Sequence, residues 1–179
     1  MSLNMDPQGW VNEATRVPSP NFNQRPPEVE VSLIVIHCIS LPPGEFGGDA
    51  ICELFLNQLD CHSHPYYETL KGLEVSSHFL IRRGGELIQF VSCHERAWHA
   101  GISVWQDKLN CNDYSIGIEL EGTTDREFTE EQYLSLLELV KLLKKYYPII
   151  DLVGHQHIAP GRKDDPGPYF DWHRLTSLK

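Results

Sequence analysis

Residues 31–39 constrain the fold most strongly, because this run is almost entirely apolar, is rich in β-branched side chains and contains one histidine, His37. A strand that is apolar on both faces is typical of the interior of a sheet that is covered on each side. We therefore expect a buried central strand here. Burial of an imidazole without a polar partner is costly, so His37 is also a first candidate for a functional side chain.

Two further patterns extend the sheet and its cover. Residues 115–121 alternate with period two, which predicts a strand with isoleucine and leucine on one face and Glu119 and Glu121 on the other. A capping-box pattern at Thr129 precedes a helical apolar face that continues to Tyr147, and Pro148 ends that helix.

The remaining elements are shorter. We expect an extended proline-rich lead-in over residues 16–28, a helix capped by Asp49 and continuing to Leu59, a hairpin over residues 78–91, a strand over residues 149–153, a loop over residues 154–168 and a short helix over residues 170–178. This mixture predicts an α/β fold in a single domain, with a mixed central β-sheet flanked by helices.

Length and charge limit the domain organisation and the partners. A chain of 179 residues suits one domain over residues 1–179, in which residues 1–9 are expected to be disordered or foreign to the natural protein. The formal net charge of −10 argues against nucleic acid and against an anionic membrane surface as partners. The sequence indicates no obligate protein partner.

The expected compartment is the cytoplasm. The N-terminal residues lack the apolar core of a secretory signal, and no apolar run approaches the ~20 residues of a membrane span. The five cysteines are odd in number and lack the Cys-x-x-Cys spacing, which favours reduced thiols over a disulfide framework or a cysteine zinc site.

Histidines and a charged loop supply the candidate metal ligands. His37 lies near the end of one predicted strand, His155 follows another, and Asp164 and Asp165 lie in the loop after it. Two imidazoles and one carboxylate match a zinc site that keeps an open position for water. The pattern alone leaves the choice between the two aspartates open, and a structural histidine is the alternative for each imidazole. The His-x-His sequences at residues 62–64 and 155–157 are rival ligand pairs, of which the first suits a solvated surface better.

Other side chains suit acid–base chemistry or substrate binding. Glu119 lies deeper in its strand than Glu121, which favours Glu119 as a general base and Glu121 as a solvated carboxylate. Lys163 suits either a surface ion pair or the stabilisation of a developing oxyanion. Trp98 and His99, which lie among small residues, suit either a platform for a sugar or peptide or a buried core.

Several segments occur together in a specific order, namely residues 17–22, 35–37, 39–47, 76–81, 96–101, 111–122, 154–155, 158–163, 165–168 and 170–172. In these segments the chain resembles the zinc N-acetylmuramoyl-L-alanine amidase family, which also includes peptidoglycan recognition proteins and phage amidases. The resemblance covers residues 10–174. It implies the amidase fold, with His37, His155 and Asp165 as zinc ligands, Glu119 as the general base and Lys163 as the cation that stabilises the tetrahedral intermediate.

The resemblance also resolves two choices that the residue pattern leaves open. Asp165 is favoured over Asp164 because the family's carboxylate directly precedes Pro-Gly, and Glu119 is favoured over Glu121 because it matches the family's Ile-Gly-Ile-Glu. The implied reaction is zinc-assisted hydrolysis of the amide between the muramyl lactyl group and L-alanine. The implied substrate is a small anhydro-muropeptide that is recycled in the cytoplasm.

The candidate substrate-binding residues are Cys38, Ala97, Trp98, His99 and Asn110. Four positions depart from the family pattern, namely Cys38, Glu74, Asn110 and His157. None of the four is an expected zinc ligand, so they do not bear on catalysis, and Cys38, Glu74 and Asn110 bear on substrate preference. His157 is in addition a candidate outer partner of the zinc site.

Two other classes of function compete with an amidase. A peptidoglycan-binding module of the same fold typically lacks a zinc ligand, whereas all three expected ligands are present here. A structural-zinc protein requires four protein ligands, whereas three ligands and a base are expected here.

Overall fold

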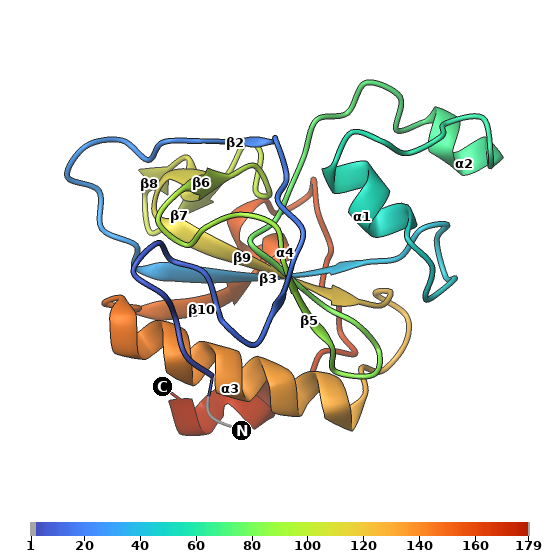
Figure 1. The fold of residues 1–179 in the computed structure, drawn as a ribbon. Helices are drawn as coiled ribbons and strands as arrows, with labels where there is room; N and C mark the ends of the chain where they lie inside the picture. The colour runs from blue at the N-terminus through green and yellow to red at the C-terminus, as the bar shows by residue number, and fades with distance from the viewer. Residues whose placement is uncertain (1–2, 179) are drawn as a thin grey trace.

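The computed structural model describes residues 3–178, and its centre is a six-stranded sheet with strand order β1-β5-β4-β9-β3-β10 (Figure 1). These strands are β1 (Thr15–Arg16), β3 (Leu33–Ile39), β4 (Phe79–Ile81), β5 (Leu87–Gln89), β9 (Ser115–Glu121) and β10 (Asp151–Gly154). The other elements are β2 (Phe22–Asn23), β6 (Arg96–Ala97), β7 (Val104–Trp105), β8 (Lys108–Leu109), α1 (Ala50–Phe55), α2 (Pro65–Glu68), α3 (Glu130–Tyr146), α4 (His155–Ile158), and the 3-10 helices Cys111–Asp113 and Trp172–Leu178.

The expected mixed sheet is confirmed. Strand β3 lies in the interior, parallel to β9 on one side and to β10 on the other. Strands β4 and β5 pair antiparallel and form the predicted hairpin. Both faces of β9 are buried along its whole length, which confirms that the sheet is covered on each side.

Helix α3 covers one face of the sheet, and the site lies on the other. In Figure 1 α3 runs along one side, while α1 and α2 lie beyond the opposite side. Leu136 and Val140 of α3 pack with Ile34 and Ile118 in one core cluster. The predicted capping box is present at Thr129, so the long helix begins where its sequence pattern predicts.

Several element boundaries differ from the prediction. Helix α1 ends at Phe55 instead of Leu59, and Asp49 stands at its N-cap position without a side-chain capping bond. Residues 154–168 are not a continuous loop, because the short helix α4 begins directly after β10. The predicted C-terminal helix is a 3-10 helix that begins at Trp172.

The expectation of disorder over residues 1–9 is wrong for residues 3–9, while residues 1–2 lie outside the described part. Met5 is buried in the main core cluster and pairs with Val11 in an antiparallel bridge. Gln89 donates a side-chain hydrogen bond to the Gly9 carbonyl at 2.9 Å. Over residues 3–178, no helix has the length and apolar character needed to span a bilayer.

Candidate functional site

Three parallel strands place the candidate site residues next to one another. In the β3–β9 register His37 lies directly opposite Glu119. In the β3–β10 register Gly154 lies opposite Ile36, so the next residue, His155, begins α4 beside His37. Asp165 reaches the same point from the loop that follows α4. Its backbone carbonyl accepts a hydrogen bond from the Gln156 N–H at 2.9 Å.

The side chains of His37, His155 and Asp165 converge on one point. The two histidine Nδ1 atoms are 3.0 Å apart; Asp165 Oδ2 lies 3.2 Å from that of His37, and Asp165 Oδ1 lies 3.2 Å from that of His155. His155 Nε2 lies 3.0 Å from the Ala100 carbonyl, an acceptor, so this nitrogen carries the proton and Nδ1 presents a lone pair. Electron-pair donors crowded in this way repel one another unless they share a cation. The donor set therefore fits a metal ion with two nitrogen ligands and one oxygen ligand.

Burial and charge favour the protonation states that a metal ion requires. The side chains of His37 and His155 are almost fully buried, with 2% and 5% of their surface exposed. Burial lowers the pKa of His37 to about 4, against the opposing effect of its hydrogen bond with Asp165, so the ring is neutral at pH 7. Burial acts to raise the pKa of Asp165, but hydrogen bonds with His155 and His37 outweigh it and hold this pKa below its ordinary value. A neutral imidazole and a charged carboxylate are the forms that bind metals.

Glu119 faces this metal position without belonging to the ligand group. Its Oε1 lies 4.0 Å from His37 Nδ1, while its buried Oε2 has no hydrogen-bond partner within residues 3–178. Burial raises the pKa of Glu119 well above its ordinary value, Asp165 raises it further, and Lys163 acts in the opposite direction. A carboxylate with high proton affinity and an unoccupied oxygen is suited to accept a proton from a molecule in the cleft.

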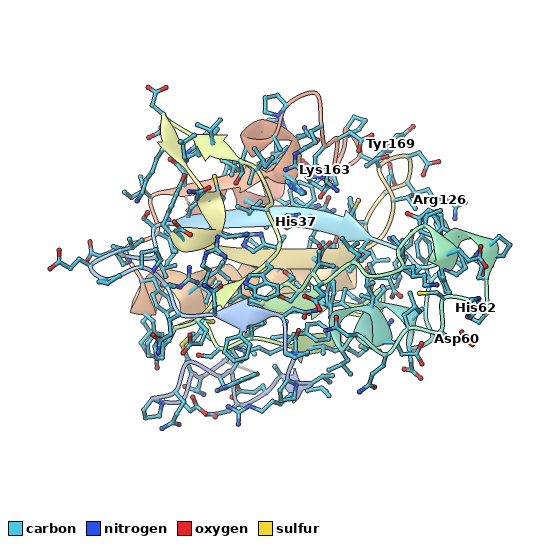
Figure 2. The ribbon with its side chains drawn as sticks, turned by 90° about the horizontal axis from the view of Figure 1, so that it is seen from above. His37, Asp60, His62, Arg126, Lys163 and Tyr169 are labelled. Carbon is cyan, nitrogen blue, oxygen red and sulfur yellow. The ribbon has the colours of Figure 1, made fainter. Side chains whose placement is uncertain are left out.

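The metal position lies in a cleft of about 480 Å³. This volume falls within the range of small-molecule sites. Lys163, Cys38 and Trp98 line the cleft together with the candidate ligands. The Trp98 indole is fixed by a 2.7 Å hydrogen bond from its Nε1 to Asn23 Oδ1, so the ring forms a rigid part of the wall. His62, by contrast, is exposed and lies at a remote edge of the molecule in Figure 2, which agrees with a solvated surface position for this residue. His64 is only partly exposed, and its Nδ1 accepts a 3.1 Å hydrogen bond from the Tyr66 N–H at the start of α2.

A comparison with known families identifies the chain. The family model for N-acetylmuramoyl-L-alanine amidase matches residues 26–168. The chain belongs to this amidase family. The 1,6-anhydro-N-acetylmuramyl-L-alanine amidase AmpD of Citrobacter freundii is 51% identical over 173 residues, which cover 96% of this chain and 92% of that protein.

Solved structures agree with the assignment of the chain to the amidase family. A crystal structure of a selenomethionine derivative of AmpD matches with a TM-score of 0.95 at 50% identity, covering 98% of each chain. The Escherichia coli amidase AmiD, solved with anhydro-N-acetylmuramic acid-L-Ala-D-γ-Glu-L-Lys, matches with a TM-score of 0.62 at 27% identity. That alignment covers 98% of this chain and 65% of AmiD. The predicted fold class and family are thereby confirmed.

Some of the predicted site residues of the amidase lie elsewhere. Ala97 is completely buried in a core cluster and cannot touch a substrate. Asn110 is exposed before the 3-10 helix Cys111–Asp113 and does not line the cleft. His157 accepts a 2.8 Å hydrogen bond from the Gly154 N–H, so it supports the first turn of α4. Glu121, expected to be solvated, is only 2% exposed and is bound by protein groups.

Sequence reasoning missed part of the amidase site. The cleft-lining ring of His99 is hydrogen bonded at both nitrogens by His37 and Ser115, so neither nitrogen is available to a substrate. The sequence did not predict that Ser115 would contact the His99 ring or that Gly117 would leave space for it. A glycine inside a strand often marks a close approach by another group, and Gly117 was the available signal.

Proposed function

We propose that this amidase hydrolyses the amide bond between (anhydro-)N-acetylmuramic acid and L-alanine in muropeptides, with a zinc ion held by His37, His155 and Asp165. The observation that carries the proposal is the convergence of these three donors in a cleft, opposite Glu119. The anhydro form of the sugar is supported by the activity for which the Citrobacter freundii relative is named and by the ligand of the AmiD structure.

Zinc suits this ligand set. Catalytic zinc sites commonly use three histidine or carboxylate ligands and keep a further position open for water or substrate. When bound, the ion supplies a Lewis acid that polarises the amide carbonyl and lowers the pKa of water in its open position.

The protein side chains provide the proton transfers and charge stabilisation. Glu119 accepts a proton from the attacking water as the water oxygen bonds to the carbonyl carbon. Lys163 stabilises the negative charge that develops on the carbonyl oxygen. Glu119 then returns the proton to the amide nitrogen as the C–N bond breaks. The products are a lactyl carboxylate on the sugar and a peptide with a free N-terminal amine.

The cleft walls bind the two halves of the substrate. We assign the fixed indole of Trp98 to an apolar face of the sugar or peptide, since aromatic rings provide large contact areas at little entropic cost. Cys38 lines the same cleft and is placed to affect substrate preference. The resemblance to the cytoplasmic branch of the family supports a role in cytoplasmic peptidoglycan recycling.

The decisive experiment measures release of the L-alanyl peptide from anhydro-N-acetylmuramyl peptide. Zinc-loaded wild type is compared with chelator-stripped protein, with stripped protein after zinc is restored, and with Glu119→Ala. Glu131→Ala, at an exposed position on α3, is the matched control. We expect release by wild type, by the zinc-restored sample and by the control only. Release that survives both metal removal and Glu119→Ala would overturn the mechanism.

A peptidoglycan-binding module is the competing function. It predicts that the zinc-loaded wild type binds the same muropeptide without releasing peptide. The convergence of all three candidate ligands beside a buried carboxylate favours the enzyme.

A further inference from the structure

The two histidines of the candidate metal site differ in the group that contacts Nε2, the ring nitrogen on the side away from the metal position. His155 Nε2 faces the backbone carbonyl of Ala100, which only accepts hydrogen bonds, so the position of its proton is fixed. His37 Nε2 instead faces another imidazole, the Nδ1 atom of His99, at 2.9 Å. Because an imidazole nitrogen either donates or accepts, the proton position on His37 depends on the state of His99.

His99 is itself held at several points. Its Nε2 lies 3.1 Å from the hydroxyl of Ser115, the first residue of β9. Its backbone N–H donates to Asn112 Oδ1 at 3.1 Å. The His99 and His37 rings meet edge to face, with centroids 5.0 Å apart and planes at 89°. This arrangement directs the in-plane lone pair of one ring nitrogen toward the other ring.

Gly117 provides the space for the His99 ring. A Cβ atom built at Gly117 would lie 2.5 Å from His99 Cγ and 2.7 Å from its Nδ1. No real side chain tolerates such distances, so the ring packs directly on the β9 backbone because residue 117 is glycine. A side chain at this position would move the nitrogen that contacts His37.

We propose that His99, supported by Ser115 and accommodated by Gly117, is a positioning residue that sets the tautomer and orientation of His37 for metal binding. This inference rests on the proposed metal site. For Nδ1 of His37 to bind a metal, its Nε2 must carry the proton. This N–H then donates a hydrogen bond to His99 Nδ1. His99 then carries its own proton on Nε2 and donates to Ser115. Outer partners of this kind commonly change metal affinity by about 10–100-fold when removed.

The test measures zinc affinity by competition with a chelating dye, without reference to catalysis. We expect His99→Leu to weaken zinc binding by about 10–100-fold. His99→Asn retains an acceptor near the position of Nδ1 and is expected to restore most of the affinity. Trp98→Leu, a neighbouring substitution in the same cleft, is expected to leave zinc affinity unchanged. The smaller changes Ser115→Ala and Gly117→Ala, each expected to weaken binding, test the proposal if the His99 variants fail to fold.

A spectroscopic measurement on the metal-free protein gives an independent readout. Nitrogen-15 NMR of the His37 imidazole is expected to show a larger share of the Nε2–H tautomer in the wild type, where His99 accepts from Nε2, than in His99→Leu, where Asp165 alone holds the proton on Nδ1. Unchanged zinc affinity and tautomer in His99→Leu would overturn the proposal, as would an Asn variant as weak as the Leu variant. Failure of the proposed function has a different signature, because His155→Ala would then leave zinc binding intact.

Discussion

Two glutamates on the same face of β9 show how surroundings assign roles to identical side chains. Glu121 accepts hydrogen bonds from the Gly47 N–H at 2.7 Å, from the Arg83 N–H at 3.1 Å and from Arg82 Nη1 at 3.1 Å. Glu119, two residues earlier, has one oxygen beside the metal position that finds no hydrogen-bond partner among residues 3–178. A fully paired carboxylate stabilises the structure, whereas an unpaired buried one is available for proton transfer.

Replacing Glu119 by Gln is expected to separate catalysis from metal binding. The amide keeps the shape of the side chain but cannot accept the proton, so kcat should fall by about 10²–10⁴-fold. Zinc affinity should change little, because Glu119 is not one of the three ligands. The metal-free variant should be at least as stable as wild type in urea, since the neutral amide avoids the burial of a charge. A kcat within tenfold of wild type would contradict the assignment.

Replacing Glu121 by Ala is expected to lower the stability of the fold. The change leaves the mostly buried Arg82 without its ion-pair partner and frees the N–H groups of Gly47 and Arg83. The free energy of unfolding, measured in urea, should fall by about 3–5 kcal/mol. Glu131→Ala, an exposed control, should cost less than about 0.5 kcal/mol. A loss below about 1 kcal/mol for Glu121→Ala would show that these contacts do not stabilise the fold.

At the scale of elements, the junction of β10 and α4 positions two of the three candidate ligands. Gln156 makes two hydrogen bonds with the loop. Its N–H donates to the Asp165 carbonyl, and its Oε1 accepts from the Gly167 N–H. The sequence predicted the strand before His155 but not this helix, because a single turn has no apolar periodicity to reveal it. Its stability comes instead from the loop that folds back over it, a contact that the local sequence does not encode.

Gly154→Ala tests this junction. A Cβ atom at this position would lie 2.7 Å from Cδ of Pro166, the residue after Asp165. Because the proline ring cannot move independently of the loop, we expect Asp165 to shift and zinc affinity to fall by about 10–100-fold. Gly84→Ala is the control, since its Cβ would meet only the flexible carboxylate of Glu86. Equal zinc affinity in the two variants would contradict the role of the junction.

At the scale of the whole molecule, the features that can be predicted from the sequence are those that depend on residues close together in the chain. The strand predicted over residues 31–39, which the structure has over Leu33–Ile39, and the capped helix at Thr129 follow from periodicity and capping, and both elements are confirmed. Burial of Glu121 and the order of residues 3–9 depend on segments distant in sequence that pack over them. The pairing of His37 with Glu119 likewise requires the parallel register of two strands that are far apart in the chain.

Removal of residues 1–9 tests the contribution of the N-terminal segment. Met5 packs in the main core cluster, and Gln89 bonds both the Gly9 carbonyl and the Val11 N–H. We expect the free energy of unfolding to fall by about 2–5 kcal/mol, the range for loss of one large buried side chain. Zinc affinity should be unchanged, since no candidate ligand lies in this segment. Met5→Ala should reproduce most of the loss, and a truncated protein as stable as the full chain would refute the prediction.

Metal binding is expected to stabilise the entire domain, because its candidate ligands join β3, α4 and the loop that carries Asp165. A ligand that binds only the folded state adds about 2.7 kcal/mol at a free concentration of 100 times Kd, which corresponds to about 5–11 °C in Tm for a domain of this size. Thermal unfolding of stripped protein at increasing zinc concentration measures this shift. His155→Ala should abolish it and Trp98→Leu should retain it. A shift that persists in His155→Ala would mean that zinc stabilises the fold from another site, because the converging donors then lack one of their two imidazoles.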